Sequence, residues 1–183
     1  MKRIILTVLM LLICTTVCFA EENDVPKTKV ESVLLKSGVL YQKQSMPLGD
    51  IDNIEFSAVI ITDQNDLVTA KGLKITVPGY NRLTSSSWLD VDEVNDLLKA
   101  IEYMISSSKS WDGKPLKSLK EVVFSTKDHF RLSFYGKPAS LVKINDLQMV
   151  VSSGYGQKTS SIMDIEHLEE FKNIINKGLV VLK

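Results

Sequence analysis

The phrases GYNRLTSSSWLDVDEV (79–94) and GYGQKTSSIMDIEHL (154–168) decide the fold of this chain. Both read Gly-Tyr, three variable residues, Thr-Ser-Ser, apolar residues and Asp, followed by an apolar pattern with helical spacing. The simplest interpretation is that Gly-Tyr turns the chain, Thr-Ser-Ser forms a last strand, and Asp caps a helix. A phrase that occurs twice in one small protein indicates a repeated structural unit.

The repeat extends well beyond these phrases. A shift of 74 residues places Phe56 on Phe130 and Val77 on Val151 without a gap, and Asp90 on Asp164 further along. Between them, the doubled phrase matches at a shift of 75, and Ser87 is the one extra residue that restores the register. Matches that follow turns and elements in this way predict an internal duplication.

Each unit is expected to consist of four short strands and one helix. Alternating or β-branched runs predict strands over 30–42, 54–62, 67–77, 119–126, 130–136, 139–145 and 147–153. The first helix is expected to start at Asp90 and to end in the serine-rich segment 106–110. The second is expected to start at Asp164, with Gly178 as its C-terminal cap.

These elements predict an α+β fold in which two ββββα units, 30–108 and 117–183, form one globular domain over 30–183. Neither unit can bury both faces of its sheet and its helix alone, so antiparallel sheets and two helices would pack about a pseudo-twofold axis. The alternative is a single barrel-like antiparallel sheet capped by the C-terminal helix. Strand-rich units that end in a helix and occur in two copies are also found in the Whirly and PUR proteins, which bind single-stranded nucleic acid. This chain resembles them in the order of its elements alone.

The N-terminal segment predicts export. Residues 1–20 combine Lys2 and Arg3, an apolar run and small residues before Glu21, which is typical of a signal peptide cleaved near Ala20. The mature chain would be secreted or periplasmic, and a lipoprotein anchored at Cys18 is the minor alternative. Residues 21–29 are polar and indicate a disordered or extended lead-in.

Composition narrows the chemistry of the mature chain. Both cysteines lie in the leader, which excludes disulfides and thiolate sites after cleavage. Without Lys2 and Arg3 the chain has 20 basic and 22 acidic residues, so its net charge gives no case for nucleic acid. No second apolar run is long enough for an integral membrane segment. His129 and His167 lack partners at metal-ligand spacing, so neither a metal nor another cofactor is expected.

These observations favour an exported, non-enzymatic binding or interaction module with an unknown protein or small-molecule partner. The sequence offers no catalytic residue, and its candidate binding residues are four aromatic side chains, Trp111, Tyr41, Tyr80 and Tyr155. The segment 36–53 is longer than its counterpart and predicts a unit-specific surface loop. Two alternatives stay open. One is a small exported hydrolase using carboxylates, and the other is a carrier with an apolar cavity lined by Phe56, Phe130 and Phe134.

Overall fold

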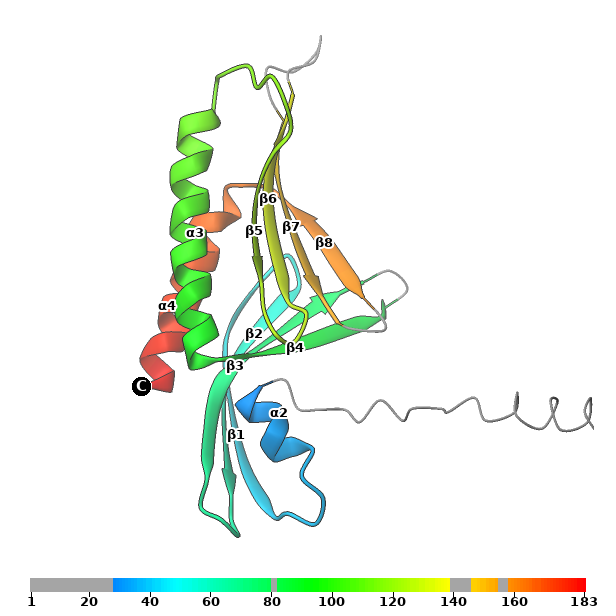
Figure 1. The fold of residues 1–183 in the computed structure, drawn as a ribbon, viewed down its shortest axis with the longest axis vertical. Helices are drawn as coiled ribbons and strands as arrows, with labels where there is room; N and C mark the ends of the chain where they lie inside the picture. Colours follow the sequence, from blue (N-terminus) through cyan, green and yellow to red (C-terminus); the bar gives the residue numbers. More distant parts are fainter. Residues whose placement is uncertain (1–27, 80–81, 139–145, 155–157) are drawn as a thin grey trace, which may run out of the picture.

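The structure, a computed structural model, describes residues 28–79, 82–138, 146–154 and 158–183. It contains two four-stranded antiparallel sheets, each followed by a long helix (Figure 1). The first unit comprises α2 (Lys29–Leu34), β1 (Tyr41–Ile51), β2 (Ile54–Asp63), β3 (Thr69–Pro78), β4 (Thr84–Asp90) and α3 (Val91–Trp111). The second comprises β5 (Lys120–Ser125), β6 (Arg131–Lys137), β7 (Asp146–Ser153), β8 (Thr159–Met163) and α4 (His167–Leu182). The duplicated α+β architecture is therefore confirmed, and the single-sheet alternative is wrong.

The two units depend on each other for their core. The helices α3 and α4 lie side by side, and α4 contacts β1, β2 and β3 of the other unit (Figure 1). Phe171 of α4 meets Phe56 of β2 edge to face, with ring centroids 4.9 Å apart. Reciprocally, Trp111 of α3 stacks on Phe134 of β6 at 5.1 Å. Each helix thus helps to cover the sheet of the other unit, as the burial argument requires.

Strand pairing corrects the register of the repeat. Phe56 pairs with Ile75 in the first sheet, whereas Leu132 pairs with Val151 in the second. The shifts that carry β2 onto β6 and β3 onto β7 must therefore add up to 152, so the gapless shift of 74 predicted for both strands is wrong. Equal shifts of 76 satisfy the pairing. From β4 to β8 the shift is 74, because Leu73 pairs with Leu89, and Met149 with Met163. Both shifts are even, so each core-facing residue keeps its face of the sheet.

The segment predicted as a strand over 30–42 instead begins with the end of a short helix and becomes strand only at Tyr41. Thr28 and Glu31 form a capping box that starts α2, so Thr28 and Lys29 do not belong to an extended lead-in. Residues 21–27 of the predicted lead-in lie outside the described residues. Val30 and Val33 pack on Val59 of β2, on the sheet face opposite the main core. The spacing of these valines fits a helix as well as a strand, which is the usual ambiguity of short apolar runs.

The segment 36–53 was predicted as a surface loop, and this is wrong for most of its length. Its residues 41–51 form β1, which pairs with β2 from Tyr41↔Asp63 to Ile51↔Ile54, with a bulge between Pro47 and Gly49. β1 therefore occupies the edge position that β5 occupies in the second sheet.

Three predicted helix ends also need correction. α3 continues through the serine-rich segment to Trp111, and within it Ser108 and Ser110 donate their hydroxyls to helical carbonyls three residues earlier. α4 starts at His167 rather than Asp164, since residues 164–166 form a turn. Gly178 is not a cap but a buried residue within α4, where a Cβ atom would lie 3.0 Å from Leu48 Cδ1.

The start of α3 follows the prediction. Asp90 is its N-cap, and Glu93 accepts a hydrogen bond from the Asp90 amide at 3.1 Å. Both carboxylate oxygens of Asp90 also accept from the Lys29 amide, at 3.0 and 3.1 Å, which joins α2 to α3. Residues 1–20, which the sequence predicts to be a signal peptide, lie outside the described residues. Within the described part of the chain, no helix has the length and hydrophobicity needed to span a bilayer.

Candidate functional site

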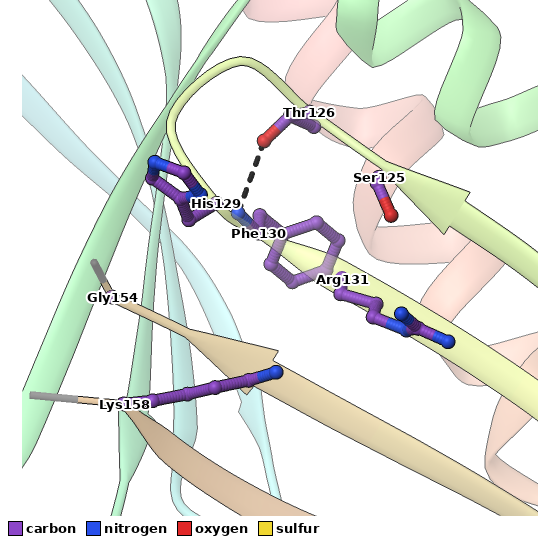
Figure 2. A pocket seen from close by; sticks show the side chains of 7 residues that line it. All are labelled: Ser125, Thr126, His129, Phe130, Arg131, Gly154 and Lys158. Carbon is purple, nitrogen blue, oxygen red and sulfur yellow. Dashed lines mark hydrogen bonds between the residues drawn. The ribbon is translucent and has the colours of Figure 1, made fainter. Parts of the chain in front are cut away.

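A cavity of about 370 Å³ lies in the second unit, between the β5–β6 hairpin and the facing ends of β7 and β8 (Figure 2). We call it the hairpin cavity. Its lining residues come from three short segments and are Ser125, Thr126, His129, Phe130, Arg131, Gly154 and Lys158. None of these seven is a carboxylate, and three carry nitrogen-bearing cationic or imidazole side chains. A volume of this size lies within the range of small-molecule sites.

The hairpin turn forms one wall of the cavity. The Thr126 hydroxyl accepts a hydrogen bond from the Phe130 amide at 3.1 Å, and the Thr126 amide donates to the Phe130 carbonyl at 3.0 Å (Figure 2). His129 has a positive φ of 54°, which the tight turn requires of it. Phe130 is fully buried, so it supports the wall from behind and offers no ring surface to a ligand.

The hairpin is also tied to the other unit. Asp128 accepts from the Trp88 amide through its carboxylate at 2.7 Å and from the Ser87 hydroxyl through its carbonyl at 2.7 Å. The Glu93 carboxylate accepts from the Lys127 amide at 2.9 Å. These contacts hold the turn in place from β4 and α3, so the wall of the cavity is preorganised.

Arg131 supplies a positive charge at the cavity. Its Nη2 atom lies 3.2 Å from Glu121 Oε1, and its Nε atom donates to Ser133 Oγ at 3.0 Å. These two contacts orient the guanidinium group while leaving other N–H donors unused, since the group has five. Lys158 approaches from the opposite wall, and its extended side chain reaches across the cavity toward β6 (Figure 2).

The cationic residues are specific to the second unit. The paired positions Arg131↔Ser152 correspond to Glu55↔Thr76 in the first sheet, so Arg131 replaces a glutamate. At the shift of 74 that places β4 on β8, Lys158 matches Thr84, and Arg82 lies two residues before Thr84 in the first copy. The two copies therefore share a backbone here but differ by several units of charge.

Sequence reasoning did not single out Arg131 or Lys158. They are 27 positions apart, and no motif connects them. A signal was present in the comparison of the copies, because both are charge differences between otherwise matching segments. The features specific to one copy that the sequence analysis singled out were the segment 36–53 and Trp111.

Of the four predicted aromatic binding residues, two lie within the described part of the chain. Trp111 ends α3 and stacks on Phe134, with Lys120 Nζ 5.4 Å from its ring centroid. Tyr41 begins β1 and is 43% exposed. The end of α3 and the start of β1 lie at opposite ends of the molecule (Figure 1), so these two aromatics form no common site. Tyr80 and Tyr155 lie outside the described residues.

The residues expected to line an apolar carrier cavity belong to the packed core. Phe56, Phe130 and Phe134 are all buried, and Phe56 and Phe134 contact the rings of Phe171 and Trp111. The hairpin cavity is instead bounded by hydroxyl, guanidinium and ammonium groups.

Other titratable residues form small surface clusters. His167 lies 3.3 Å from Asp52 and 3.2 Å from Glu170, at the start of α4. Among the described residues, no group of three histidine, cysteine or carboxylate side chains could hold a metal ion. The Asp63 carboxylate is buried and paired with Lys36, which holds the pKa of Asp63 below its usual value.

Comparison with known proteins adds no assignment to this geometry: no protein-family model matches the chain, and no curated protein matches it.

Proposed function

We propose that the mature chain is an exported, non-enzymatic binding module whose ligand occupies the hairpin cavity. The observation that carries this proposal is the cavity itself, about 370 Å³ in volume and lined by polar and cationic groups without a carboxylate. Acid–base catalysis by a pair of carboxylates, the hydrolase alternative, would need such groups in the cavity wall.

The surrounding structure supports a binding role. Asp128 and Lys127 are fixed by hydrogen bonds from or to the other unit, so the turn is held without a ligand. A rigid wall reduces the conformational entropy lost on binding. The basic start and apolar run of residues 1–20 support export.

Mass spectrometry of the natively exported protein tests this function. The wild-type chain is purified gently from its export compartment and compared with Ser125→Trp, which fills the cavity from an exposed strand position. The matched control is Ser45→Trp, also exposed on an edge strand but in the first sheet. We expect a small molecule to accompany the wild type and the control but not Ser125→Trp, and the mature chain to begin near Glu21.

Two results would contradict the proposal. One is equal retention of a small molecule by Ser125→Trp and Ser45→Trp, which would move binding away from the hairpin cavity. The other is recovery of the molecule in a chemically altered form after incubation with purified protein, which would favour catalysis.

A further inference from the structure

We propose that the hairpin cavity recognises a small polar molecule through an oxyanion, either a carboxylate or a phosphate, bound between Arg131 and Lys158. This rests on the proposed function, because it names the ligand class of the same cavity.

The charge of the cavity is positive. Arg131 and Lys158 line it, and the nearest opposing charge established by contact is Glu121, 3.2 Å from Arg131 Nη2. Two cations and no carboxylate line the cavity, and Glu121 offsets part of the charge of Arg131. Lys158 has no ion pair or hydrogen bond with any residue in the described ranges, so its ammonium group is available to a ligand. The whole mature chain is slightly acidic, so this positive site is a local feature.

The donors are arranged for an oxyanion. Glu121 and Ser133 engage Nη2 and Nε of Arg131 and fix the plane of its guanidinium group. The remaining N–H donors of that plane can bind a carboxylate or phosphate in the forked geometry that arginine favours. Lys158 adds a charged donor from the facing wall, and Ser125 lies beside Arg131 on the neighbouring strand β5 (Figure 2). Hydroxyl groups suit a polar ligand body.

Size favours a small molecule. The cavity has the volume of roughly a dozen water molecules at about 30 Å³ each. The first unit has Glu55 at the position that matches Arg131, so the charge pattern of this cavity is not repeated at the equivalent strand pair. A polyanion such as a nucleic acid would need an extended basic surface.

Calorimetric titration of the mature protein at low ionic strength tests the inference. The probes are inorganic phosphate, glucose 6-phosphate, glucuronate and uncharged glucose. Glucose 6-phosphate and glucuronate separate a phosphate source from a carboxylate source, and glucose is the neutral control. We expect at least one charged probe to bind, glucose not to bind, and the affinity to fall as salt is added.

Variants that remove a positive or a negative charge at the cavity should change the affinity for an anion in opposite directions. Lys158→Gln should weaken binding at least about tenfold, the low end for a lost charge-assisted hydrogen bond. Glu121→Gln should strengthen it, because the opposing carboxylate is gone. Lys117→Gln removes an exposed lysine elsewhere and should change nothing. A merely structural role of these residues would not produce opposite effects from Lys158 and Glu121.

The inference is overturned if glucose binds as well as the charged probes, if no charged probe binds, or if Lys158→Gln behaves like Lys117→Gln. Any of these results leaves the proposed function standing, provided that the cavity-filling Ser125→Trp variant still loses the co-purified molecule. Conversely, unchanged retention in Ser125→Trp would reject the cavity as the binding site whatever the charge of the ligand.

Discussion

The Oγ atoms of Ser87 and Ser153 lie 2.7 Å apart in the fully buried contact between the two units. Ser87 also donates its only hydroxyl proton to the Asp128 carbonyl at 2.7 Å, so Ser153 must be the donor to Ser87. The chain Ser153–Ser87–Asp128 therefore joins β7, β4 and the turn that forms the wall of the hairpin cavity.

Ser87→Ala should lower the free energy of unfolding by about 1–3 kcal/mol, because it leaves the Ser153 hydroxyl and the Asp128 carbonyl without their partner in a buried place. Urea denaturation measures the change. Ser160→Ala, at an exposed position of β8, is the control and should stay within about 0.5 kcal/mol of wild type. A double-mutant cycle with Ser153→Ala should show coupling between the serines, and strict additivity would contradict the assigned network.

The ion pair between Lys36 and Asp63 predicts a pH dependence of stability. Lys36 Nζ lies 3.0 Å from Asp63 Oδ2 and also contacts Asp66. The hydrogen bond from Lys36 lowers the pKa of Asp63 from 3.8, and hydrogen bonds to Asp66 and Asp63 raise the pKa of Lys36 from 10.5. The stabilisation by Asp63 is therefore complete above pH 3.8 and is lost as pH falls through its lowered pKa. That by Lys36 is complete below pH 10.5 and is lost as pH rises through its raised pKa.

Comparison with Asp63→Asn isolates this pair from the other carboxylates. The stability difference between wild type and variant should be constant over the neutral range and shrink toward both extremes of pH. Denaturation curves recorded across pH measure it. Asp96→Asn, which removes an exposed carboxylate near Lys99, should show almost no difference at any pH. A difference for Asp63→Asn that grows on acidification would have the wrong sign.

Gly72 is a position where β3 tolerates no side chain. A Cβ atom there would lie 2.5 Å from the Leu89 carbonyl oxygen and 3.0 Å from Val30 Cγ2. Gly72→Ala should therefore destabilise by about 1–3 kcal/mol, the usual cost of overpacking, because a backbone atom cannot yield as a side chain can. Gly178→Ala is the matched control. It meets only the ends of Leu48 and Leu73, and alanine gains about 1 kcal/mol in helix propensity, so its loss in thermal unfolding should be smaller.

The success and failure of sequence reasoning have physical causes. The plan of four strands followed by a helix in each unit was predictable because each unit repeats a local pattern, and the strands that begin at Thr84 and Thr159 follow the doubled phrase. The alignment of β2 and β3 with the second unit was not predictable. Identical residues such as Phe56 and Phe130 matched by chance at a shift of 74. Cross-strand pairing, a long-range property, requires shifts that add up to 152 for the two strands.

The remaining errors came from tertiary contacts that no local pattern carries. The docking of Val30 and Val33 on β2 makes residues 29–34 helical, and the exchange of helices between the units buries Gly178. The candidate site also depends on tertiary contacts that no local sequence pattern indicates. Arg131 and Lys158 meet only because two separate hairpins of one sheet end side by side.

Substitution of Trp111 tests whether this aromatic residue stabilises the fold or binds a ligand. Its ring stacks on Phe134 with an interplanar angle of 15°, and a Cβ atom on Gly136 would lie 3.3 Å from its Cε3 atom, so it closes the end of the core. Trp111→Ala should cost about 3 kcal/mol in urea denaturation, the low end for removing such a ring from a core, because the residue is half-buried. Tyr103→Ala, which removes an exposed aromatic from the same helix, should change stability by no more than about 0.5 kcal/mol. Below its unfolding transition, Trp111→Ala should still bind the charged probes as wild type does. Normal stability combined with lost binding would instead return Trp111 to the candidate binding residues.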